Sequence, residues 1–98
     1  MRSNINGYDN TALGSGALYS NGGGNKNTAI GRQALFYNVN GDYNTATGYK
    51  SLRSNTVGQL NTAYGALSLY SNTYGGGNTA AGYVALYYNT IGNNNTAY

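Results

Sequence analysis

The tripeptide Asn-Thr-Ala recurs every 17 residues, and this spacing limits the possible folds more than any other feature of the chain. The six copies begin at Asn10, Asn27, Asn44, Asn61, Asn78 and Asn95. A disordered tract rich in glycine, asparagine and tyrosine has no reason to keep such a register. We therefore interpret residues 1–98 as one array of structural repeats, and we number the 17-residue unit from this asparagine as position 1.

Other positions of the unit are equally regular. Position 9 is leucine, positions 5 and 15 are glycine, position 12 is asparagine, and position 8 is always alanine or serine. The alanines of position 3 and the leucines of position 9 form the predicted core: Ala12, Leu18, Ala29, Leu35, Ala46, Leu52, Ala63, Leu69, Ala80 and Leu86. The predicted asparagine ladders are position 1 (Asn10, Asn27, Asn44, Asn61, Asn78, Asn95) and position 12 (Asn21, Asn38, Asn55, Asn72, Asn89). The predicted turn glycines are Gly14, Gly31, Gly48, Gly65 and Gly82 with Gly24, Gly41, Gly58, Gly75 and Gly92.

The short unit and its glycines select the fold class. A helical hairpin needs about 33 residues, and each glycine inside a helix costs roughly 1 kcal/mol. We predict an all-β parallel β-solenoid with one unit per coil, about 5.5 coils and strands about 4.8 Å apart. Positions 1–4 (residues 27–30, for example) predict one strand and positions 7–11 (residues 33–37) a second. Alanine of position 3 and leucine of position 9 should face inward, and threonine of position 2 outward.

One alanine and one leucine per coil make a thin core, so we expect additional burial between chains. Large apolar residues gather at a few outward positions, and stacked coils would turn these positions into stripes. Tyrosine suits both a protein interface and a sugar surface, because its ring is apolar and its hydroxyl is polar. The candidate interface or glycan contacts are Tyr19, Phe36, Tyr70, Tyr87, Tyr49 and Tyr83.

The chain has few of the side chains that enzymes use for catalysis. Cysteine and histidine are absent, which excludes zinc fingers, thiol nucleophiles and disulfides. Asp9 and Asp42 fall two coils apart, roughly 10 Å at the spacing of β-strands, and at solvated turn positions. We expect no enzymatic activity, no metal site and no cofactor.

The charge and the hydropathy of the chain argue against two kinds of partner, nucleic acid and a membrane. The net charge is +3, from five basic and two acidic residues. Of the basic residues only Arg2 and Arg53 share a position of the unit, three coils apart, so we expect no phosphate-tracking stripe and no nucleic-acid partner. No apolar run approaches the roughly 20 residues that cross a bilayer, so we expect no membrane insertion. The first residues lack the apolar run of a secretion signal, and we expect any export signal to lie outside this segment or to be replaced by another route.

Residues 78–94 match the unit Asn-Thr-Ala-x-Gly-x-x-Ala-Leu-x-x-Asn-Thr-x-Gly-x-x at every fixed position. This unit resembles the repeats of bacterial and phage tail-fibre-domain proteins. More distantly, it is similar to the head repeats of trimeric autotransporter adhesins, whose shorter unit shares the x-Ala-x-Gly core. The resemblance covers residues 4–98. It implies a left-handed parallel β-roll, often trimeric, on a cell or virion surface.

Three functions follow as hypotheses. The leading one is a structural extracellular module, either a segment of a longer fibre or a filament subunit, that stacks head to tail and packs laterally through its tyrosine-rich stripes. Its partner would be itself. The alternative is an adhesin head that binds glycans. The third is an ice-binding solenoid, because Thr11, Thr28, Thr45, Thr62, Thr79 and Thr96 form a regular row.

Overall fold

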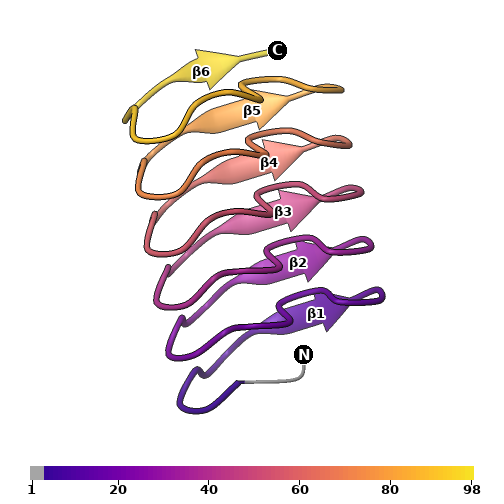
Figure 1. Cartoon of the computed structure of the whole chain (residues 1–98), viewed down its shortest axis with the longest axis vertical. Helices are drawn as coiled ribbons and strands as arrows, with labels where there is room; N and C mark the ends of the chain where they lie inside the picture. Colours follow the sequence, from indigo (N-terminus) through magenta and orange to yellow (C-terminus); the bar gives the residue numbers. More distant parts are fainter. Residues whose placement is uncertain (1–3) are drawn as a thin grey trace.

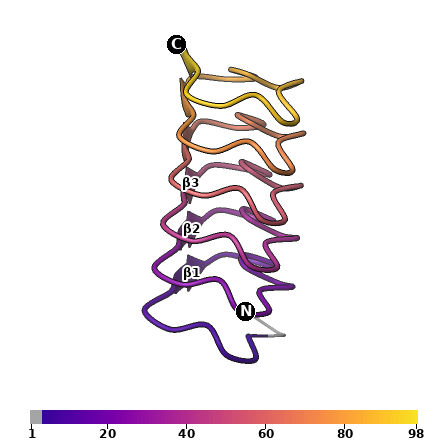
Figure 2. The ribbon, with the colours of Figure 1, turned by 90° about the vertical axis from the view of Figure 1, so that its left-hand side faces the viewer.

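A computed structural model describes residues 4–98 as a single stack of coils (Figures 1 and 2). Six short strands form one parallel sheet in chain order. They are β1 (Thr11–Leu13), β2 (Thr28–Ile30), β3 (Thr45–Thr47), β4 (Thr62–Tyr64), β5 (Thr79–Ala81) and β6 (Thr96–Ala97). Residues 4–98 contain no helix. The predicted β-solenoid is confirmed, with about five turns and dimensions of 32 × 22 × 17 Å.

Each strand is displaced from the next by one 17-residue unit, so identical residues lie side by side. Thr11 pairs with Thr28, and Ala12 pairs with Ala29. The same register continues to β6. Because successive side chains of a strand point to opposite faces, the central alanine of every strand faces inward and the threonine before it faces solvent.

The prediction of a second strand at residues 33–37 and their equivalents is wrong. These segments are turns. Gln33 and Leu35, at positions 7 and 9, have left-handed backbone angles of φ 59° and 48°, whereas a β-strand needs strongly negative φ at every residue. The coils still bond to one another here, since the Leu35 amide donates to the Ser51 carbonyl at 3.0 Å.

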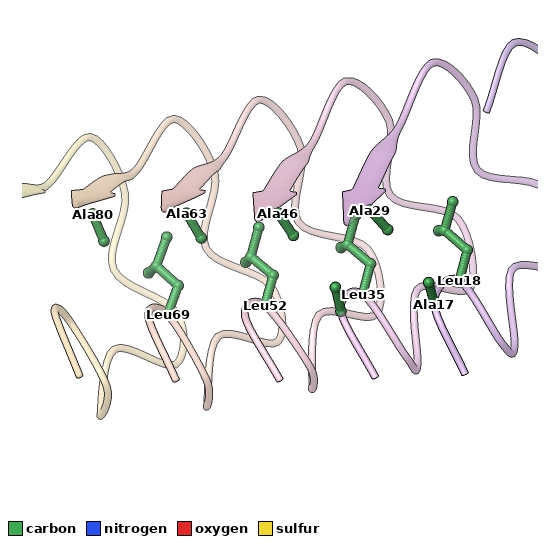
Figure 3. Packing of buried hydrophobic residues seen from close by; sticks show 10 residues of the cluster. Ala17, Leu18, Ala29, Leu35, Ala46, Leu52, Ala63, Leu69 and Ala80 are labelled. Atoms are coloured by element: carbon green, nitrogen blue, oxygen red, sulfur yellow. The ribbon is translucent and has the colours of Figure 1, made fainter. Parts of the chain in front are cut away.

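The core is a row of leucines facing the row of strand alanines (Figure 3). Leu18, Leu35, Leu52 and Leu69 have no exposed surface, and the same holds for the alanines of β2 to β5. Ala12 and Leu86 are partly buried and pack against this cluster. A left-handed leucine is conformationally costly, and full burial of its side chain, worth about 1.5–3 kcal/mol, offsets that cost.

Glycine at position 5 turns the chain out of each strand. The five residues have φ between 120° and 130°, a region that only glycine adopts readily. Three residues later the interior accepts serine in place of alanine, because the hydroxyl has a partner in this turn. Ser51 Oγ donates to the Gly48 carbonyl at 3.1 Å, and Ser68 Oγ donates to the Gly65 carbonyl at 2.8 Å.

Candidate functional site

The asparagines of position 12 form a continuous ladder inside the coils. The Asn38 amide group donates to Asn21 Oδ1 at 2.8 Å, and Asn55 donates to Asn38 Oδ1 at 2.8 Å. Each also donates within its own coil to the glycine carbonyl three residues ahead, as Asn55 does to Gly58 at 2.9 Å. Asn21, Asn38, Asn55 and Asn72 have no exposed surface. The hydrogen-bonding groups of these side chains are therefore used within the fold.

The asparagines of position 1 form a second ladder that bonds to the backbone. The Asn44 backbone amide donates to Asn27 Oδ1 at 2.9 Å, and Asn44 Nδ2 donates to the Gly58 carbonyl at 2.8 Å. That carbonyl is the one that Asn55 also uses. The two ladders are joined in the same way at Gly24, Gly41, Gly75 and Gly92. No buried side-chain nitrogen or oxygen of the described residues lacks a hydrogen-bond partner.

The glycines of position 15 are invariant for a different reason from those of position 5. They lack positive φ. A Cβ added to Gly58 would overlap Asn55 Oδ1 and the Gly75 carbonyl oxygen. The asparagine ladders and the next coil approach so closely that they leave room only for a hydrogen atom.

Position 10 carries a stack of rings and one guanidinium group that runs along the solenoid. Tyr19 and Phe36 stack with ring centroids 4.7 Å apart, and Tyr70 and Tyr87 stack at 4.9 Å. Arg53 fills the coil between these pairs, with its guanidinium carbon 5.4 Å from the Phe36 centroid and 5.8 Å from the Tyr70 centroid. Each of these four rings thus stacks on another ring or lies against Arg53 with at least one face, and all four are half-buried.

Tyr49 and Tyr83, the other two candidate contacts, lie at position 6 and are exposed by 42% and 76%. Position 4 lies two residues earlier, across the turn glycine, and also carries exposed apolar residues. Together these two positions place one bulky apolar side chain on each of the five complete coils. We call this the edge stripe: Leu13, Ile30, Tyr49, Tyr64 and Tyr83.

The threonine row of position 2 lies on the outer face of the sheet, in register from β1 to β6. Its flanking position 4 varies in size, with large residues such as Leu13 and Tyr64 and smaller ones such as Thr47 and Ala81. The outer face of the sheet is therefore uneven along the axis.

Three basic residues come together, although their unit positions differ. Arg32 and Tyr49 occupy position 6 of adjacent coils, and Lys50 follows Tyr49 with its Nζ 4.9 Å from that ring's centroid. Lys50, through a hydrogen bond and its charge, lowers the pKa of Tyr49, with smaller effects from Arg32 and Arg53. The sequence prediction of scattered cations missed this grouping, because the expected strand over positions 7–11 would place Lys50 and Arg53 on opposite faces.

Lys26 lies elsewhere, at position 17. Its Nζ donates to Tyr43 Oη at 3.1 Å, and this hydrogen bond raises the pKa of Lys26. The two carboxylates do not meet. Asp42 accepts hydrogen bonds from the Asn25 backbone amide at 2.8 Å and from Asn25 Nδ2 at 3.3 Å, whereas Asp9 is exposed with a left-handed φ of 56°.

Other kinds of site are absent from the part of the chain that the structure describes. Residues 4–98 form no pocket and no group of three or more metal-ligating side chains. No helix long and apolar enough to span a membrane occurs among them.

Comparison with protein-family models, with curated proteins and with solved structures finds no match to this chain.

Proposed function

We propose that this chain is a structural module of an extracellular fibre or filament, in which solenoid rods associate laterally along the edge stripe. The observation that carries the proposal is the exposed stripe itself, running along a rod whose polar interior is already saturated. Large apolar side chains aligned on one edge of a soluble rod are typical of an association surface. The resemblance of the unit to tail-fibre and adhesin-head repeats supports an extracellular role.

The internal ladders supply the stiffness that such a module needs. Every coil bonds to the next through the strand, both asparagine ladders and the position-9 turn. The bonds recur at nearly constant length, as in the Asn21–Asn38, Asn38–Asn55 and Asn55–Asn72 steps of 2.8, 2.8 and 3.0 Å. Bending the rod would lengthen several of these bonds at once, and each contributes about 0.5–1.5 kcal/mol.

The edge stripe has a shape suited to packing against another rod. Its large side chains alternate across the turn glycine in the last three complete coils. Coil by coil, the residues at positions 4 and 6 are Thr47 and Tyr49, then Tyr64 and Ala66, then Ala81 and Tyr83. Each tyrosine thus has a small residue beside it, and a staggered row of large side chains and recesses can interdigitate with a second such row.

Sedimentation velocity over a range of concentrations tests the proposal. We expect the native chain to associate at micromolar concentration. Tyr64→Ser combined with Tyr83→Ser should weaken association by about tenfold per tyrosine, as truncation of buried interface aromatics does. Tyr43→Ser is the matched control, because Tyr43 is also exposed but lies at position 17, outside the stripe.

Two results would contradict the proposal. One is a native chain that sediments as a folded monomer at every concentration. The other is equal weakening by the stripe variant and the Tyr43→Ser control, which would show that association does not depend on the edge stripe. Circular dichroism of each variant establishes that the solenoid is intact in both cases.

A further inference from the structure

The three grouped cations and two tyrosines beside them form a second surface, which shares only Tyr49 with the edge stripe. We call it the basic patch: Arg32, Tyr37, Tyr49, Lys50 and Arg53. It spans two adjacent coils, which are held together by a hydrogen bond from the Lys50 backbone amide to the Arg32 carbonyl at 2.9 Å. Within residues 4–98, none of these cations forms an ion pair.

Arg53 is held in place by its neighbours while keeping donors available. Its guanidinium carbon lies 5.0 Å from the Tyr37 centroid. Its Nε donates to Gln33 Oε1 at 3.3 Å, and its Nη1 donates to Tyr70 Oη at 3.4 Å. A guanidinium has five N–H donors, so two used donors leave three for a ligand. Packing between rings fixes their direction and lowers the entropy lost on binding.

Lys50 and Arg32 supply the remaining charge. Arg32 is exposed, and Lys50 stands over one face of Tyr49. The Tyr49 hydroxyl feels the field of all three cations, since each of them lowers its pKa. The two carboxylates of the chain, Asp9 and Asp42, are at positions 17 and 16, outside the patch.

We propose that the basic patch binds an acidic polysaccharide through carboxylate or sulfate groups on neighbouring sugars. Guanidinium groups pair with such oxyanions through two parallel hydrogen bonds, and ammonium groups add a second anchor. The two coils are about 4.8 Å apart, so cations one coil apart can meet anionic groups on adjacent sugars. The Tyr49 hydroxyl and the Gln33 amide can bond sugar hydroxyls between them.

The geometry favours a polysaccharide over single-stranded nucleic acid. Nucleic-acid grooves combine many phosphate contacts with open aromatic faces for base stacking. In this patch, Arg53 covers one face of Tyr37, and Lys50 covers one face of Tyr49. The charge is also confined to two coils. The proposal goes beyond the structural function above and does not depend on it.

Titration of the isotope-labelled full chain, followed by NMR, tests the proposal at low salt. The probes are a heparin-derived hexasaccharide (sulfates and carboxylates), an oligogalacturonate (carboxylates only), neutral cellohexaose and an oligothymidylate. The variants are Lys50→Gln and Arg32→Gln, with Lys26→Gln as the charge-matched control outside the patch. Repeating the titration in the Tyr64→Ser, Tyr83→Ser background, which keeps the patch, separates ligand binding from lateral association.

We expect at least one acidic oligosaccharide to shift the amide signals of Arg32, Tyr49 and Lys50, and cellohexaose to shift none. Comparison of the two acidic probes identifies carboxylate or sulfate as the recognised group. Each patch variant should weaken binding by about threefold to fivefold, as expected for removal of one exposed charge contact, with little change for Lys26→Gln.

Three results would overturn the proposal. The first is no binding of either acidic oligosaccharide. The second is equal weakening by Lys26→Gln, which would show that binding depends only on the net charge of the chain. The third is tighter binding of the oligothymidylate at the same salt concentration, which would assign the patch to nucleic acid.

Discussion

Replacing Asn55 by aspartate would test whether the inner asparagine ladder stabilises the solenoid. Asn55 Nδ2 donates to Asn38 Oδ1 at 2.8 Å and to the Gly58 carbonyl at 2.9 Å. Aspartate has the same shape but, when ionised, accepts hydrogen bonds only. The substitution therefore removes both donors and sets acceptor against acceptor in a site with no exposed surface.

The size of the effect follows from these contacts. Two hydrogen bonds contribute about 1 kcal/mol each. The Gly58 carbonyl keeps its bond from Asn44 Nδ2, but Asn38 Oδ1 loses its donor, and an unpaired buried acceptor costs about 1–3 kcal/mol. We expect Asn55→Asp to lower the free energy of unfolding by about 3–5 kcal/mol at pH 7.

The loss should shrink in acid. Burial raises the pKa of the new carboxyl above its unfolded value of about 3.9. Between these two pKa values the folded state binds more protons than the unfolded state, so stability falls as pH rises. At low pH the protonated carboxyl can donate one hydrogen bond and recover part of the loss.

Urea denaturation at pH 7 and pH 3, followed by circular dichroism, measures both effects. Asn40→Asp is the matched control, because Asn40 is exposed and makes no side-chain hydrogen bond within residues 4–98. The reasoning is refuted if Asn55→Asp costs less than about 1 kcal/mol, if the control costs as much, or if the loss is the same at both pH values.

Three further predictions concern single positions. Leu52→Ala should lower the unfolding free energy by about 2–5 kcal/mol in urea titrations, and a loss below this range would mean that the leucine row is not the core. Gly65→Ala should lower the unfolding free energy by at least about 2 kcal/mol, because Gly65 has a φ of 120° and crowded backbone beside it. Gly23→Ala, where a Cβ would meet only one side-chain oxygen, should cost less than half as much. Equal losses for the two variants would contradict this reasoning. Tyr49 should ionise at a lower pH than an ordinary tyrosine in absorbance titrations, so the stability of the fold should rise as pH increases through its depressed pKa. Lys50→Gln should raise the pKa of Tyr49. A titration unchanged by this substitution would exclude the interaction between Lys50 and Tyr49.

The sequence predicted the fold because its fixed positions are those that the fold constrains most. A leucine and an asparagine repeated every 17 residues are consistent only with coils of one length, and β1 to β6 pair in that register. The turn at positions 6–11 was not predictable from residue preferences. Leu35 and Gln33 have left-handed φ, which few residues other than glycine adopt, so an alternating strand was the natural expectation.

The incorrect prediction of a second strand also explains why the grouping of basic residues at the surface was not predicted. A strand over positions 7–11 would place positions 7 and 10 on opposite faces, which made Lys50 and Arg53 look scattered. In the turn these residues lie close together, and Arg53 enters the ring stack between Phe36 and Tyr70. A signal was present in the sequence, since position 10 is aromatic in the other four complete coils. A guanidinium group can replace a ring in a stack because it is planar and attracted to π faces.

The shared carbonyl at each position-15 glycine has a consequence for how the gene can change. Every coil offers its neighbours the same two amide donors and the same acceptor, so any coil can follow any other. Unequal recombination that gains or loses whole 17-residue units therefore leaves the interior chemistry intact, whereas a frame-preserving change whose length is not a multiple of 17 would shift both ladders out of register at once. The length of such an array is free to vary, while its diameter is not.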